Sequence, residues 1–120
     1  MDVLFEDETP WLFELGCFLE DRGIEASDVT EITMLVKSNP DDTDGAALVT
    51  KLLGSSQIAF VGTDAVSVTI ATTDYGSGKM EIGGSYYVYL GFTATGYTGA
   101  YLEARLKNHM ITIIQDGVRD

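Results

Sequence analysis

The sequence has few basic residues, and this shortage excludes one class of partner. Only 7 of its 120 residues are Lys or Arg, against 19 Asp and Glu, so the formal net charge at pH 7 is −12. Proteins that bind DNA or RNA gain much of their affinity from clustered Lys and Arg that neutralise phosphates. The basic residues here are scattered singly: Arg22, Lys37, Lys51, Lys79, Arg105, Lys107 and Arg119. The composition therefore argues against nucleic acid and anionic membrane surfaces as partners.

Cysteine and histidine are equally scarce, with one residue of each. A single cysteine cannot form an internal disulfide, so nothing in the sequence implies an oxidising compartment. Nucleophilic catalysis usually needs a nucleophile beside a basic His. The sequence leaves a pair between Cys17 and His109 open, but Cys17 lies in an apolar stretch, where we expect it to pack as a small hydrophobe.

Long apolar runs are also missing. No stretch approaches the ~18–20 apolar residues that a membrane-spanning helix needs. Residues 1–8 contain no basic region followed by an apolar one, so we expect no signal peptide and synthesis in the cytoplasm. The length fits one domain over residues 1–120, since domains most often have ~100–150 residues.

The dominant pattern that is present is an alternation of apolar and polar residues, which is typical of strands with one buried face. For residues 46–53 both a short helix and a strand are open, although Val49 and Thr50 favour a strand. The stretches expected to form strands are 11–19, 29–37, 46–53, 58–61, 66–70, 86–92, 101–106 and 110–114. Seven to eight short strands predict an all-β fold, an antiparallel immunoglobulin-like β-sandwich, with closure into a barrel left open.

Turn-forming residues separate these stretches. Asp21-Arg22-Gly23 predicts a tight turn in which glycine can adopt positive φ. Residues 38–45 form a polar loop with Asn39-Pro40 and three aspartates, and the glycine-rich residues 72–85 contain Asp74-Tyr75-Gly76, a candidate for a single helical turn.

Tyrosines form the most prominent cluster besides the acids: Tyr86, Tyr87, Tyr89, Tyr97 and Tyr101. Alternation places Tyr86 on one face of its strand and Tyr87 and Tyr89 on the other. We expect one set in the core and the other facing outward. An outward row of tyrosines would suit a protein interface or a sugar-binding platform. Trp11, the single tryptophan, would not belong to such a platform, because we expect it to be buried.

Three sequence patterns that could indicate a binding or catalytic site do not support one. Asp41-Asp42-Thr43-Asp44-Gly45 suggests calcium, but alignment on Gly45 puts Pro40 at the first ligand position and Lys51 at the last. Gly76-Ser77-Gly78-Lys79 lacks the first glycine and the final Ser or Thr of a phosphate-binding loop. A pair of carboxylates at the spacing of a glycosidase carries no information among 19 acids. We therefore assign no catalytic, cofactor-binding or metal-binding residue, and leave open whether the acidic loop binds calcium.

The acidic residues concentrate at the beginning of the chain. Residues 1–31 contain ten acids and a single base, Arg22. Such charge can simply keep edge strands solvated and prevent their aggregation. It can also form a contact surface for a basic partner. Both interpretations stay open.

The order of these segments resembles that of a known family. An acidic opening precedes Thr9-Pro10-Trp11-Leu12-Phe13-Glu14-Leu15, and a turn at Asp21-Arg22-Gly23 precedes the stretch 24–37. The strand Val66-Ser67-Val68-Thr69-Ile70 and the segment 84–90 follow, and Met110-Ile111-Thr112-Ile113-Ile114 ends a last hairpin. Over residues 5–114 the chain resembles the small β-sandwich modules of tailed bacteriophages, in particular the N-terminal domain of the baseplate upper protein family.

The resemblance implies a non-enzymatic structural component of a tailed-phage or prophage virion that mediates subunit assembly in the tail or baseplate region. Its partners would be other virion structural proteins in many symmetric copies, without a small-molecule substrate. It would be synthesised in the cytoplasm of the bacterial host and reside in the virion. A capsid decoration protein, a neck protein and a carbohydrate-binding β-sandwich module are the alternatives. The chain lacks a long C-terminal extension that would carry a receptor-binding element.

Overall fold

The protein is built from short strands in two sheets. The computed structural model describes residues 2–95, 102–104 and 110–115, and this part contains no α-helix. Its strands are β1 (Asp2–Leu4), β2 (Trp11–Glu14), β3 (Val29–Lys37), β4 (Val49–Leu52), β5 (Ile58–Val61), β6 (Ala65–Val68), β7 (Ser85–Ala94), β8 (Leu102–Ala104) and β9 (Met110–Ile114). The 3-10 helices are η1 (Glu20–Arg22), η2 (Ala26–Asp28), η3 (Asp44–Ala46), η4 (Leu53–Ser55) and η5 (Thr72–Asp74). The prediction of an all-β chain is confirmed.

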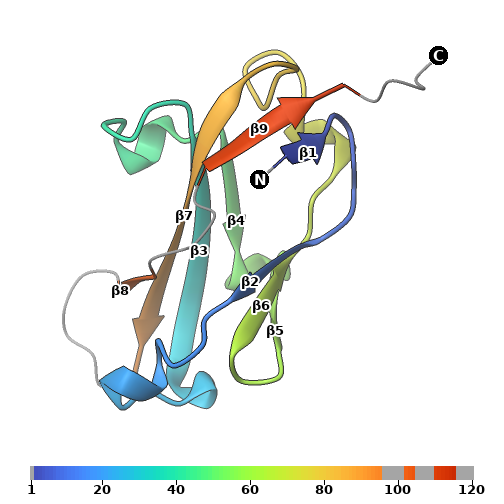
Figure 1. The fold of residues 1–120 in the computed structure, drawn as a ribbon. Helices are drawn as coiled ribbons and strands as arrows, with labels where there is room; N and C mark the ends of the chain where they lie inside the picture. The colour runs from blue at the N-terminus through green and yellow to red at the C-terminus, as the bar shows by residue number, and fades with distance from the viewer. Residues whose placement is uncertain (1, 96–101, 105–109, 116–120) are drawn as a thin grey trace.

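Two sheets form rather than a closed barrel (Figure 1). The larger sheet has the order β1-β9-β7-β3-β4, with β8 also paired to β7, and the smaller has the order β2-β6-β5. The centre of the larger sheet is the long antiparallel pair of β3 and β7. In this pair Met34 lies opposite Leu90, and Val36 lies opposite Val88. Within the described residues, no helix is long and apolar enough to cross a membrane.

The expectation of a purely antiparallel fold is wrong at one edge. β1 pairs in parallel with β9, and Val3 lies opposite Ile113. The sequence did not indicate this first strand, because three residues with one buried side chain show no usable alternation. The described part therefore has nine strands rather than seven or eight.

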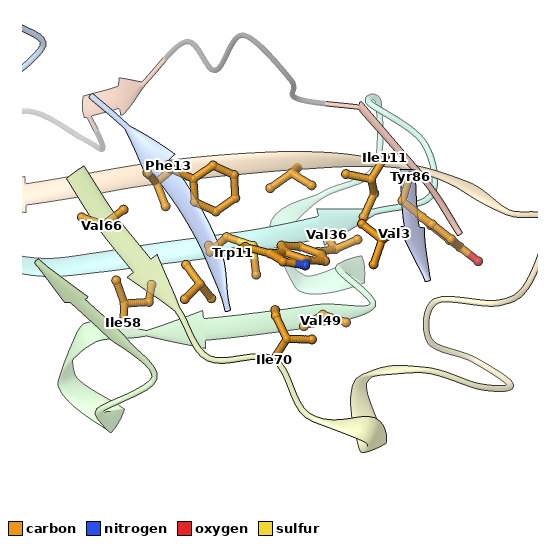
Figure 2. Close-up of a cluster of buried hydrophobic side chains, with 14 of the residues drawn as sticks. Val3, Trp11, Phe13, Val36, Val49, Ile58, Val66, Ile70, Tyr86 and Ile111 are labelled. Carbon is orange, nitrogen blue, oxygen red and sulfur yellow. The ribbon is translucent and has the colours of Figure 1, made fainter. Parts of the chain in front are cut away.

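The core lies between the sheets and follows the predicted alternation. In β7 the inward side chains are Tyr86, Val88, Leu90 and Phe92, all of which are buried. Figure 2 shows Trp11 and Phe13 of β2 within the core beside residues from the larger sheet. Their rings meet edge to face, with centroids 6.4 Å apart. The burial expected for Trp11 is confirmed.

β3 has the predicted bounds, but both of its faces are covered. Ile32, Met34 and Val36 have no exposed surface, as the inward face should. Leu35 and Lys37 on the opposite face are buried as well. Side chains of the neighbouring strands flank them there, since Leu35 lies opposite Thr50 of β4 and Tyr89 of β7. Lys37 Nζ lies 5.0 Å from the centre of the Tyr89 ring, so its cation is placed over an aromatic face.

The predicted strand over residues 11–19 is too long. β2 ends at Glu14, and Gly16 adopts a left-handed conformation with φ of 57°. The chain then turns, with the Phe18 N–H donating to the Leu15 carbonyl at 3.1 Å. The turn leaves Cys17 exposed, so the expectation that it packs in a strand face is wrong.

The turn predictions are largely confirmed. Gly23 ends η1 in the left-handed region, with φ of 68°. Within residues 46–53, for which a short helix was the alternative, Val49–Leu52 form the strand β4. The predicted helical turn at Asp74-Tyr75-Gly76 is observed two residues earlier, as η5.

Candidate functional site

A groove of about 770 Å³ opens where η1, η2 and the turn between β5 and β6 meet. These elements lie together at the end of the molecule opposite β1 and β9 (Figure 1). The apolar part of its lining is Leu15, Leu19, Ile24 and Ala26, and the acidic part is Glu20, Glu25 and Asp64. An apolar floor beside carboxylates is a lining that can hold a partner with both apolar and basic character.

Backbone hydrogen bonds hold the groove in shape. The Leu15 N–H donates to the Asp64 carbonyl at 2.7 Å and ties the end of β2 to the turn between β5 and β6. The Ile24 N–H donates to the Leu19 carbonyl at 3.0 Å and closes the turn around η1. The floor and the acidic side chains are thus carried by segments that the fold has already fixed.

Among the residues that the structure describes, no Lys, Arg or His lines the groove. Arg22, the single base of residues 1–31, is held by Phe18: its guanidinium carbon lies 4.1 Å from the ring centre, and Nη1 donates to the Phe18 carbonyl at 2.8 Å. Glu20, Glu25 and Asp64 therefore line the groove without a described Lys or Arg beside them in the lining.

The other basic residues of the described part also have specific contacts. Lys51 Nζ forms a buried ion pair with Asp74 at 2.7 Å. Lys37 Nζ donates to the Asp42 carbonyl at 3.1 Å, and Lys79 Nζ donates to the Leu48 carbonyl at 3.2 Å. These cations stabilise loops and strands instead of forming a basic patch.

A second surface lies at the opposite end, on the outward face of the larger sheet. Ile111 and Ile113 of β9 point into the core, so Met110 and Ile114 point outward. Register places Leu4 opposite Ile114 and Tyr87 opposite Met110, and directly opposite residues share a face. We call Leu4, Tyr87, Met110 and Ile114 the outer row.

The catalytic pair left open by the sequence receives no structural test. Cys17 is exposed beside η1, and His109 lies outside the described residues. The acidic loop uses its polar groups internally: the Asp41 N–H donates to Asn39 Oδ1 at 3.0 Å, and Ser38 Oγ donates to Asp42 Oδ2 at 3.2 Å. In the described part, no group of three or more His, Cys, Asp or Glu side chains could hold a metal ion.

The aromatic side chains whose burial the structure describes do not form an exposed row. Tyr86 is in the core, while Tyr87 and Tyr89 on the opposite face are half-buried. Tyr97 and Tyr101 lie outside the described residues. In the part of the chain that the structure describes, every aromatic side chain is buried or half-buried. This part therefore gives no support to the alternative of a sugar-binding module.

Sequence reasoning missed the groove, because it extended the strand pattern through residues 15–19. Two glycines, Gly16 and Gly23, frame the segment, and both adopt positive φ. Glycines that interrupt an apolar alternation indicate a turn more often than a continuing strand. That signal was available, although the proximity of Asp64 was not.

The acids of residues 1–31 do not gather into one face. Asp2 and Glu14 lie on β1 and β2, whereas Glu20 and Glu25 lie at the groove. No family model, no curated protein and no solved structure matches the chain. The groove and the outer row are therefore the two surfaces from which a function can be argued.

Proposed function

We propose that the protein is a non-enzymatic structural subunit of a tailed-bacteriophage virion and that it assembles with other virion proteins in the tail or baseplate region. The observation that carries this proposal is the outer row. It places two pairs on one face of a sheet, Leu4 with Ile114 and Tyr87 with Met110, and Thr112 lies between the pairs. Capsid decoration and neck positions are other places in the same particle. The immunoglobulin-like arrangement of the two sheets belongs to the proposal as well.

The outer row has the composition of a protein interface. Leu4, Met110 and Ile114 expose 39%, 46% and 37% of their surface, and they lie on adjacent strands. Single exposed apolar residues are normal, but contiguous ones mark contact sites. Interfaces are enriched in Tyr and Met, which the row supplies with Tyr87 and Met110.

The pairing that forms the row also makes it a firm surface. β9 bonds to β7 on one side and to β1 on the other, so its outward side chains stand on a fixed backbone. Ser85 and Thr112 exchange a hydroxyl hydrogen bond at 3.3 Å across β7 and β9 on the same face. A preformed surface loses little conformational entropy when it binds, and repeated copies in a particle add avidity.

The setting in a virion is supported by the order of sequence segments over residues 5–114, which resembles that of phage β-sandwich modules. The particle itself is the direct test. Virions purified by density gradient are expected to contain this chain in stoichiometric amounts by mass spectrometry. Its presence only in the particle-free fraction would overturn the proposal.

Variants test the role of the outer row. Leu4→Ser with Ile114→Ser should reduce incorporation into particles while the purified variant remains folded by circular dichroism. Leu12→Ser is the matched control, because Leu12 is 58% exposed but lies on β2 of the other sheet. Equal incorporation of both variants would show that the outer row is not an assembly contact.

A further inference from the structure

We propose that the groove binds an extended segment of a partner protein in which one aliphatic side chain is flanked by Lys or Arg. This site lies at the end of the molecule opposite the outer row and is independent of it (Figure 1). It therefore gives the subunit a second contact with a different chemistry.

The floor of the groove is suited to an aliphatic side chain. Leu19 is 4% exposed and forms a fixed base, while Leu15 and Ile24 are half-buried and offer apolar surface. The volume of about 770 Å³ exceeds that of one side chain and accommodates a short stretch of peptide. Removing apolar surface from water at such a floor is favourable by ~25 cal/mol per Å².

The acidic residues of the groove favour basic residues on either side of the partner's aliphatic side chain. Glu20, Glu25 and Asp64 all line the groove: Glu20 begins η1, Glu25 precedes η2, and Asp64 lies in the turn between β5 and β6. A segment bound in the groove would lie near these three side chains. An ammonium or guanidinium group beside the aliphatic anchor would meet a carboxylate, whereas an acidic segment would be repelled.

The position of Arg22 strengthens the preference of the groove for a basic partner. Arg22 follows Glu20 and Asp21 on η1, yet it stacks on Phe18 and donates to the Phe18 carbonyl. Arg22 therefore does not occupy the carboxylates that line the groove. The net charge of −12 adds long-range attraction for the same partner.

Binding of a probe peptide tests the site directly. The probe is a fluorescein-labelled octapeptide, Gly-Ser-Lys-Leu-Lys-Ile-Ser-Gly, measured by fluorescence anisotropy at low ionic strength. We expect saturable binding that weakens as salt is added, because salt screens the attraction between the lysines of the probe and the exposed carboxylates of the groove. Replacing both lysines of the peptide with Glu, or both Leu and Ile with Ser, should abolish binding. Saturable binding of either altered peptide with unchanged affinity would overturn the proposal.

Paired protein variants separate the groove from general acidity. The triple variant Glu20→Gln, Glu25→Gln, Asp64→Asn should bind the probe about tenfold more weakly, because the two lysines of the probe lose their exposed carboxylate partners. The control triple Glu8→Gln, Asp41→Asn, Glu81→Gln removes the same charge from exposed positions elsewhere and should bind within about twofold of wild type. Equal weakening in both triples would show non-specific attraction and overturn the site.

Amide chemical-shift mapping locates the bound peptide. Shifts on addition of the probe are expected at residues 15–27 and 63–64. Shifts confined to β1 and β9 would overturn the proposal. The variant Leu4→Ser with Ile114→Ser should still bind the probe, so failure at the groove and failure of the outer row can be told apart.

Discussion

Lys51 Nζ lies 2.7 Å from Asp74 Oδ2, and both side chains are nearly shielded from solvent, with 7% and 13% exposed. The pair joins β4 of the larger sheet to η5, far along the chain. Asp74 Oδ2 also accepts the Ala71 N–H at 2.8 Å. One carboxylate oxygen thus stabilises both a local turn and its attachment to the sheet.

Removing one partner of this ion pair should destabilise the protein strongly. In Lys51→Met the Asp74 carboxylate stays buried without its cation, which typically costs about 3–5 kcal/mol of unfolding free energy. Urea denaturation at pH 7 measures the loss.

The double variant Lys51→Met with Asp74→Asn is the control. It removes both charges and keeps an amide oxygen that can accept the Ala71 N–H, so we expect it to recover more than half of the loss. A single variant within about 1 kcal/mol of wild type would show that the pair contributes little.

The Tyr75 hydroxyl titrates above its ordinary range. Burial, followed by the nearby charges of Asp7 and Asp74, raises its pKa from 10.0 to about 12. Its Oη donates to the Asp7 carbonyl at 2.7 Å, which ties the segment before β2 to the residue after η5. This bond is present only while the hydroxyl is protonated.

Stability should therefore depend on Tyr75 at alkaline pH. The folded state holds its proton more tightly than the unfolded state, so the contribution is complete below pH 10 and is lost as pH rises to about 12. Tyr75→Phe should flatten this decline relative to wild type in urea melts from pH 9 to 12. An identical decline in both proteins would contradict the assignment.

Gly84 is required for close packing rather than for a special backbone angle. A Cβ at this position would lie 2.5 Å from the Tyr86 hydroxyl oxygen and 2.7 Å from the ring carbon that bears it. The ring is buried, and its oxygen accepts the Glu81 N–H at 2.8 Å. Gly84→Ala should cost about 1–3 kcal/mol of unfolding free energy, as overpacking does.

Thermal melts of two further variants check this cause. Gly45→Ala meets no atom within 4 Å and has no positive φ, so it should leave stability nearly unchanged. Gly84→Ala combined with Tyr86→Leu should lose less stability than the two single variants together, because the clash is absent. Strict additivity would argue against the clash.

Gly23 should be sensitive through its backbone. Its φ of 68° is disfavoured for side chains other than Asn and Asp, although the space around it is empty. Gly23→Ala should cost about 1–2 kcal/mol, and Gly23→Asn should cost less. Equal stability of the two variants in urea denaturation would show that the turn can relax.

Local patterns predicted the longer strands. In β5, β7 and β9 every second side chain packs inward. β3 was recognised from the apolar spacing of Ile32, Met34 and Val36, although its other face is buried too. The predicted strand at 11–19 failed, because Leu15 and Leu19 continue the spacing although the backbone turns at Gly16. The two-residue spacing shows only which side chains are apolar. A turn that buries Leu19 can have the same spacing as a strand.

The candidate site was less accessible to sequence reasoning. Glu20 and Glu25 were recognised as part of an acidic opening, but Asp64 lies about forty residues away and is brought to them by the pairing of β2 with β6. Arg22 was counted as a neutralising base, and only its contact with Phe18 removes it from the groove. Such long-range placements depend on topology, which local patterns do not determine.

The parallel pairing of β1 with β9 has a consequence for the order of folding. Val3 lies opposite Ile113, so this pair joins residues that are far apart in the sequence. Closing so long a loop is entropically costly, and contacts of this sequence separation slow folding. During synthesis β1 therefore remains without its native neighbour until β9 has left the ribosome.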